Sequence, residues 1–204
     1  MEAKSIRYYG YDKGTYLECV DMINSINRKH ILLVSSWFSS INVLYVIFSW
    51  LNLFGVTQEL SVFYISYTLL SVGFSLFLFF MSQFSERHSI MMVYVSIVIM
   101  VSYSIIISSF QPYMPASVFF IVITVAALSY IDIADRMSLI LLLLSAIFVG
   151  TSFLFKTFSI AYYDAYTALI VLTLVIVLHY SFQRMRIQQF VSYHKNIEMQ
   201  KDLI

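Results

Sequence analysis

Six long apolar segments occupy most of this chain and constrain its fold more than any other feature. A helix needs about 20 predominantly apolar residues to cross the hydrocarbon core of a bilayer. Six such segments leave little chain for a soluble domain, so we predict an all-α, polytopic membrane protein with six transmembrane helices. The predicted spans are residues 31–54, 60–82, 89–110, 116–132, 138–155 and 165–182.

The composition supports a membrane-embedded chain. Hydrophobic residues make up 60% of the sequence and charged residues only 11%, whereas about 25% of the residues in an average soluble domain are charged. The 5 glycines and 2 prolines predict fairly straight helices. This scarcity argues against transport, because transporters usually need broken helices or small-residue packing faces. The single cysteine, Cys19, has no second thiol with which to form an internal disulfide.

The distribution of basic residues predicts the orientation. When both termini are placed in the cytoplasm, every one of the 12 lysines and arginines except Lys156 falls on the cytoplasmic side. This asymmetry follows the positive-inside rule, and six crossings also place both termini on one side. We therefore predict a multi-pass protein with cytoplasmic termini. The short loops and the absence of eukaryotic sorting signals favour a bacterial inner membrane. The external loops are short, at residues 55–59, 111–115 and 156–164.

Residues 1–30 form a polar cytoplasmic segment that precedes the first span. Thr15 and Glu18 have the spacing of a capping box, and Tyr16, Val20 and Ile23 recur with a helical period. This pattern predicts an amphipathic helix at about residues 15–29 that lies on the inner leaflet. The basic residues at its end would face anionic headgroups.

A small set of charged and aromatic residues marks the external surface. Lys156 and Asp164 flank the last external loop and can pair across it, and Glu59 is the one charge in the first external loop. These three residues are candidates for recognising a small external ligand. The neighbouring tyrosines either form an interfacial aromatic belt or stack on that ligand; they are Tyr162, Tyr163 and Tyr166.

Ionisable residues at membrane depth are functional candidates, because they are costly to bury in a bilayer. His179 lies near the inner end of the sixth span, where it can hydrogen-bond to another helix or take part in proton or ligand binding. Asp132, Asp135 and Arg136 cluster between the fourth and fifth spans. Asp132 and Arg136 have the spacing of an ion pair on one helical turn. Two carboxylates alone are weak evidence for a metal site.

No catalytic motif is recognisable in the sequence. It has no HExxH motif, Walker loop, nucleophile elbow or cysteine–histidine cluster. We therefore expect no catalytic residue, metal or cofactor within these 204 residues, and no nucleic-acid partner.

The polar tail, residues 184–204, follows a transmembrane domain at residues 31–183. It contains no glycine or proline that would end the sixth helix. Its heptad-like spacing, with polar interruptions, predicts a parallel coiled coil in a homodimer. The pattern reaches the last residue without a stop signal, as in a signalling helix that leads to another domain. The seam consists of Ile187, Phe190, His194, Ile197, Lys201 and Ile204.

The layout of six spans, a cytoplasmic lead and a continuous helix after the last span resembles the sensor region of bacterial membrane-bound diguanylate cyclases. Residues 24–29 (NSINRK) and 196–204 (NIEMQKDLI) carry the likeness. In that family the last helix feeds a GGDEF catalytic domain. The GGDEF sequence does not occur in this chain, so no catalytic residue is carried over. The resemblance implies a sensor that responds to an unknown small-molecule or membrane cue.

Other classes of protein remain compatible with the sequence. Membrane histidine kinases and nucleotide cyclases use similar connector helices. A small transporter, or the substrate-binding subunit of one, has the right size, but the scarcity of helix breaks and of intramembrane charges argues against it. A membrane assembly protein whose tail recruits a cytosolic partner is a further alternative.

Overall fold

The computed structural model describes residues 5–51, 61–80, 89–110 and 114–201. These residues are helical throughout, apart from short connections, and contain no strand longer than an isolated bridge between Ser5 and Tyr11. The all-α prediction is therefore confirmed. The elements are η1 (Ile6–Tyr8), α1 (Lys13–Glu18), α2 (Val20–Trp50), α3 (Ser61–Phe80), α4 (Ser89–Ser109), α5 (Ser117–Ser129), α6 (Ala134–Phe155) and α7 (Phe158–Lys201).

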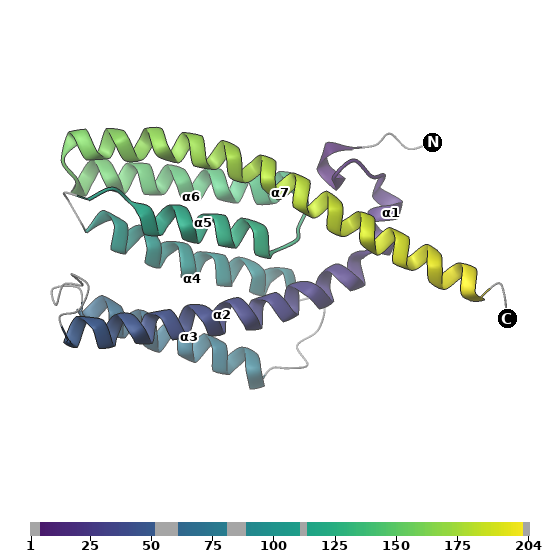
Figure 1. Cartoon of the computed structure of the whole chain (residues 1–204), viewed down its shortest axis with the longest axis horizontal. Helices are drawn as coiled ribbons and strands as arrows, with labels where there is room; N and C mark the ends of the chain where they lie inside the picture. Colours follow the sequence, from purple (N-terminus) through teal and green to yellow (C-terminus); the bar gives the residue numbers. More distant parts are fainter. Residues whose placement is uncertain (1–4, 52–60, 81–88, 111–113, 202–204) are drawn as a thin grey trace.

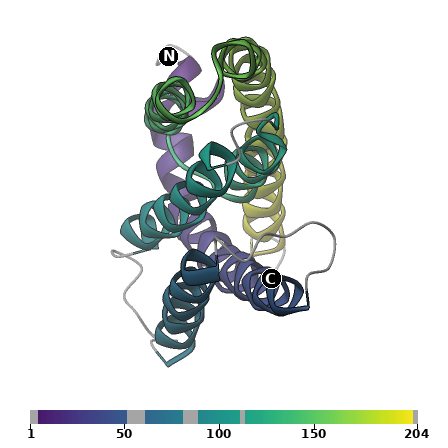
Figure 2. The same ribbon diagram turned by 90° about the vertical axis from the view of Figure 1, so that its left-hand side faces the viewer.

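The long helices lie side by side in an elongated bundle (Figure 1). Seen along the bundle, α6 and α7 lie at one edge of the cross-section, α2 and α3 lie at the other, and α4 and α5 lie between them (Figure 2). Helix η1 and the C-terminal part of α7 lie at the same end of the bundle (Figure 1). We call this the terminal end, and the opposite end, which holds the α6–α7 turn, the distal end.

Five helices are long and apolar enough to cross a membrane, with mean hydropathy between 1.8 and 2.5 in their most apolar windows. They are α2, α3, α4, α6 and α7. The predicted span 116–132 forms only the 13-residue helix α5. At 1.5 Å per residue α5 is about 20 Å long, shorter than the roughly 30 Å hydrocarbon core. The described structure therefore supports a membrane-embedded bundle with five full-length candidate spans and one short internal helix.

The chain leaves α5 in an extended conformation. Tyr130 has φ −108° and ψ 146°, and residues 130–133 connect α5 to α6. No glycine or proline lies in this link, so α5 ends here without a helix-breaking residue. The link is tolerated because it is buried in protein, where side chains can satisfy its backbone.

The N-terminal helix begins earlier than the capping-box pattern predicts. Asp12 is the N-cap of α1, and its carboxylate accepts hydrogen bonds from the Thr15 amide and hydroxyl, both at 2.8 Å. Thr15 therefore acts as a donor inside α1 instead of as the cap. Cys19 separates α1 from α2, and α2 then runs without interruption from Val20 into the first span.

The core of the bundle combines apolar contacts with short polar contacts between helices. Phe119 of α5 stacks on Phe148 of α6 with ring centroids 3.9 Å apart. Ser39 of α2 lies 3.0 Å from Ser75 of α3 between their hydroxyl oxygens. Small polar residues of this kind let helices approach closely and hydrogen-bond in a membrane.

Helix α7 is a continuous helix of 44 residues. It passes along the whole bundle and projects beyond it at the terminal end (Figure 1). The prediction that the sixth span continues into the polar tail is thus confirmed as far as Lys201.

Candidate functional site

The short helix α5 is the centre of the candidate site. It contacts α2, α4, α6 and α7, so both of its ends lie among other helices. A helix leaves its first N–H groups and its last C=O groups without partners inside the helix. In a membrane-embedded bundle these groups must be satisfied by protein. Different sets of side chains supply the partners at the two ends.

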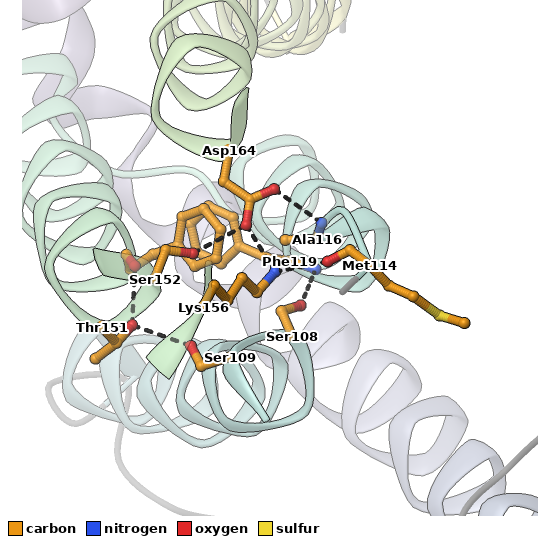
Figure 3. A network of polar contacts seen from close by, with 10 residues as sticks. Ser108, Ser109, Met114, Ala116, Phe119, Thr151, Ser152, Lys156 and Asp164 are labelled. Carbon is orange, nitrogen blue, oxygen red and sulfur yellow. Dashed lines mark hydrogen bonds and ion pairs between the residues drawn. The ribbon is translucent and has the colours of Figure 1, made fainter. Parts of the chain in front are cut away.

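A buried ion pair holds the distal end of α5 (Figure 3). Asp164 of α7 accepts the Ala116 N–H at 3.0 Å through Oδ1 and the Ser152 hydroxyl at 2.9 Å through Oδ2. The same Oδ2 lies 2.6 Å from Lys156 Nζ, and both side chains are fully buried. Lys156 also donates to the Met114 carbonyl at 2.9 Å. The expected pairing of Lys156 with Asp164 is therefore present, and it caps α5.

The other members of the predicted external set do not join this pair. The side chains of α7's first turns are mostly solvent- or lipid-facing: Tyr162, Tyr163 and Tyr166 are all more than half exposed. Their positions at the distal end fit an interfacial aromatic belt. Glu59 lies outside the described residues. Lys156 and Asp164 already bond to protein groups, so ligand recognition by this set stays a prediction.

Neutral side chains hold most of the terminal end of α5. Asn27 of α2 binds both backbone groups of Ile131: its Nδ2 donates to the carbonyl at 2.7 Å, and its Oδ1 accepts the N–H at 2.9 Å. Gln183 of α7 donates to the Tyr130 carbonyl at 3.0 Å. Asn27 and Gln183 are both fully buried. These contacts explain why the chain can leave a helix here without exposing its backbone.

His179 of α7 belongs to the same set. Its side chain is buried, its Nδ1 lies 2.6 Å from the Ala127 carbonyl of α5, and its Nε2 lies 2.9 Å from the Tyr9 hydroxyl. Tyr9 also donates its hydroxyl hydrogen to the backbone carbonyl of Asp132. Burial raises the pKa of Tyr9 above its usual range, so this phenol keeps its proton. His179 thus links α7 to α5 and, through Tyr9, to the N-terminus.

The charged residues near this link do not pair as the sequence predicts. The buried carboxylate of Asp132 accepts a hydrogen bond from the Tyr94 hydroxyl of α4. Within the described part of the chain, the ion pair at this end joins Arg7 and Asp135 at 3.5 Å. The predicted ion pair of Asp132 with Arg136 is not formed as a direct contact, because α6 begins only at Ala134 and the two residues do not share a helical turn; both nevertheless line one pocket.

The N-terminal segment, residues 5–18, covers the part of α7 that carries the predicted dimer seam. Ile187 is fully buried and Phe190 is 9% exposed within one chain. They form a cluster with residues of the N-terminal segment, the α1–α2 junction, α2, the α5–α6 link and the start of α6: Tyr9, Tyr16, Cys19, Ile23, Ile131 and Ala134.

The remaining seam residues are placed differently. His194 is exposed, and Ile197 is partly exposed. Lys201 is the last residue of α7, and Ile204 lies outside the described residues. A coiled-coil partner could therefore not contact Ile187 and Phe190 while they pack against their own N-terminal segment.

A cavity of about 460 Å³ lies beside His179. It is bounded by η1, α6 and α7, and its lining combines an apolar wall with a few polar groups. Asp135, whose side chain is 61% exposed, lines the same cavity as the buried His179. The cavity therefore joins a solvent-accessible carboxylate to the histidine. Among the described residues, no group of three or more histidine, cysteine, aspartate or glutamate side chains is placed to hold a metal ion.

Sequence reasoning found Lys156, Asp164 and His179 but not the uncharged residues that act with them. Tyr9 lies in a polar lead where its burial has no local signal. Asn27 and Gln183 each lie at the edge of a predicted apolar segment. Amide side chains at such positions were the sequence feature that could have marked them as hydrogen-bonding residues. Neither their partners nor the end of α5 could be read from local hydropathy.

Comparison with known proteins identifies no family for this arrangement. No protein-family model, no curated protein and no solved structure matches the chain.

Proposed function

We propose that this chain is a membrane-embedded sensor and signal-transduction module that passes a change in helix packing to a cytoplasmic output. The observation that carries the proposal is the set of contacts made by α7. Asp164 caps one end of α5, His179 and Gln183 bind the other end, and Ile187 and Phe190 contact the N-terminal segment. One continuous helix therefore contacts both ends of α5 and the N-terminal segment.

A movement of α5 has a direct route to the end of α7. Asp164 and Phe190 are separated by 26 residues of a single helix, from 190 − 164, or about 39 Å. Because a packed helix shifts or rotates as a unit, a small change at either end of α5 would alter the part of α7 that projects from the bundle. A two-state bundle of this kind responds to a cue that binds one state better than the other.

The proposed output is a diguanylate cyclase domain that follows α7 in the cytoplasm, as the resemblance implies. The proposed location is a bacterial inner membrane, with both termini cytoplasmic. The proposed assembly is a homodimer, since such outputs join two catalytic domains. In view of the burial of Ile187 and Phe190, the dimer contact would use the exposed part of α7 beyond Phe190, or would first displace the N-terminal segment.

The test is an insertion series in the full chain fused to a diguanylate cyclase domain. Single, double, triple and quadruple alanine insertions between Tyr193 and His194 rotate the output relative to the bundle. A signalling helix predicts cyclase activity that varies with a period of about 3.6 residues. Activity that falls steadily with insertion length, or does not change, would contradict the proposal.

A helix-breaking substitution provides the matched comparison. Gln188→Pro should uncouple the fused output from the bundle while leaving membrane insertion intact, because proline disrupts a helix interior. Gln188→Ala preserves the helix and is the control. Equal output from the two variants would count against transmission through α7.

A transporter, or the substrate-binding subunit of one, is the second candidate, and one observation favours it. Transporters often place binding sites where a helix is interrupted inside the membrane, and α5 ends in a buried extended link. Solute uptake into vesicles that contain the purified chain would support this function. Uptake that is lost on Asn27→Leu, together with an insertion series without periodicity, would favour transport over signalling.

A further inference from the structure

We propose that His179 is a proton-binding site, and that its bound proton completes a hydrogen-bonded chain from α5 through α7 and the N-terminal segment to the α5–α6 link. The chain runs from the Ala127 carbonyl to His179, on to the Tyr9 hydroxyl, and ends at the Asp132 carbonyl.

The two carbonyl groups that end this hydrogen-bonded series determine where the hydrogens must lie. A backbone carbonyl only accepts hydrogen bonds, so the contact of 2.6 Å between His179 Nδ1 and the Ala127 oxygen requires a hydrogen on Nδ1. Similarly, Tyr9 gives its only hydroxyl hydrogen to the Asp132 carbonyl. The Tyr9 oxygen then remains as an acceptor.

The middle contact determines the charge of the ring. Nε2 of His179 lies 2.9 Å from the Tyr9 oxygen, and this contact needs a hydrogen from one of the two atoms. Tyr9 has already used its hydrogen, so Nε2 must supply it. A histidine with a hydrogen on both ring nitrogens is an imidazolium.

Neutral His179 cannot satisfy the same geometry. With the hydrogen on Nδ1, two acceptors, Nε2 and the Asp132 carbonyl, compete for the single hydrogen of Tyr9. With the hydrogen on Nε2 instead, Nδ1 faces the Ala127 carbonyl and neither atom can donate. Each neutral form leaves at least one buried acceptor without a hydrogen, and buried polar groups in native proteins are nearly always hydrogen-bonded.

The surroundings of His179 contain charges of both signs. The buried Asp132 carboxylate lies in the α5–α6 link at the end of the proton chain. Asp135, which pairs with Arg7, lines the adjoining cavity. Further titratable or charged side chains lie on the elements packed around this region. They include Tyr8, Tyr11, Tyr16, Cys19, His30, Tyr94, Arg136, Tyr180, Arg184 and Arg186.

The cavity supplies a route for the proton. It is lined by both Asp135 and His179, and the Asp135 side chain is 61% exposed. The cavity therefore connects the surroundings of the buried histidine with the solvent-accessible side of the bundle. The ligand class is therefore a proton, delivered from the terminal end of the bundle.

Loss of the proton would act on the N-terminal segment. Tyr9 would then bind either His179 or the Asp132 carbonyl, and one of its two links would be lost. Tyr9 packs in the same cluster as Ile187 and Phe190 of α7, so its release would reach the projecting part of that helix. This consequence, in which proton binding is the cue, rests on the proposed signalling function; the proton site itself does not.

The first test counts protons directly. Nitrogen-15 NMR of the full chain with labelled histidine, in lipid nanodiscs, distinguishes imidazolium from either neutral tautomer. His179→Gln identifies the His179 signals among the 4 histidines, and His194→Gln, at an exposed position of the same helix, is the matched control. We expect hydrogens on both His179 nitrogens at the acidic end of the range from about pH 5 to about pH 8, and loss of one at the basic end. A single protonated nitrogen throughout that range would overturn the proposal.

The second test measures the consequence in the N-terminal segment. Hydrogen exchange of the Tyr8 and Gly10 amides, which both donate to the Ser5 carbonyl, is compared at low and high pH after correction for the intrinsic exchange rate. We expect protection to fall by roughly tenfold on proton loss, as the breaking of one hydrogen bond predicts. His194→Gln should retain this change and His179→Gln should lack it. Equal pH dependence in the two variants would contradict the link through Tyr9.

The two proposals can fail separately. If His179 is doubly protonated but the activity of the fused cyclase does not depend on pH, the proton site is supported and proton binding is not the cue. A periodic insertion series with a neutral His179 would support signalling and overturn the proton site.

Discussion

The two ends of α5 solve the same problem with different chemistry. At the distal end, the fully buried ion pair of Lys156 and Asp164 caps the helix. At the terminal end, Asn27, Gln183 and the His179–Tyr9 contact bind the backbone where the chain becomes extended. A buried ion pair is costly to separate, whereas the terminal end includes His179, the proposed proton site. The comparison suggests a fixed end and an adjustable end.

The largest expected effect comes from breaking the fixed end. Asp164→Ala removes the cap of Ala116 and leaves Lys156 buried without its counter-charge. We expect a loss of about 3–5 kcal/mol in the free energy of unfolding, measured in mixed detergent–SDS micelles. Tyr163→Ala, at an exposed position one residue away, is the control. Equal stability of the two variants would show that the ion pair does not hold α5.

Breaking the terminal end at its amide contact should cost less. Asn27→Leu removes both hydrogen bonds to Ile131 and leaves that buried backbone without its side-chain partner. The expected loss is about 1–3 kcal/mol in the same unfolding measurement. Ser40→Ala, at an exposed position of the same helix, should change stability by no more than about 0.5 kcal/mol. A loss as large as that of Asp164→Ala would remove the distinction between the ends.

The adjustable end should respond to a single hydroxyl group. Tyr9→Phe retains the ring and deletes the atom that joins His179 to the Asp132 carbonyl. The expected loss of stability is about 1 kcal/mol, and the pH dependence of N-terminal protection should disappear with it. Tyr163→Phe provides the control for removing a tyrosine hydroxyl. Persistence of the pH dependence in Tyr9→Phe would place the responsive group elsewhere.

The smallest expected effect is confined to α1. Hydrogen bonds from the Thr15 amide and hydroxyl lower the pKa of Asp12. Its capping contribution is therefore present above the pKa of the unfolded chain and is lost as pH falls through the lower pKa of the folded chain. Asp12→Ala should speed hydrogen exchange of the Thr15 amide without changing global unfolding, whereas Asp12→Ser retains a cap. A lower free energy of global unfolding in Asp12→Ala would contradict this prediction and show that α1 stabilises the whole bundle.

The apolar stripe of α7 that predicts a coiled-coil dimer is partly covered by the same chain. Ile187 and Phe190 have the spacing of a coiled-coil seam, and an apolar stripe on a helix must be covered by something. Here the N-terminal segment covers it within one chain. The stripe was recognisable in the sequence, but whether an intramolecular or intermolecular surface covers it depends on contacts far apart in the chain.

The sequence by itself determined that this is a helical, membrane-embedded chain, because long apolar segments with few charges have no other stable arrangement. It also indicated the pairing of Lys156 with Asp164, since eight residues separate them across one tight turn. Only the tertiary structure decided that residues 116–132 would stop short as α5. The partner of Ile131 lies 104 positions away in the sequence, and an extended link inside a bundle is stable only where such distant side chains bind its backbone.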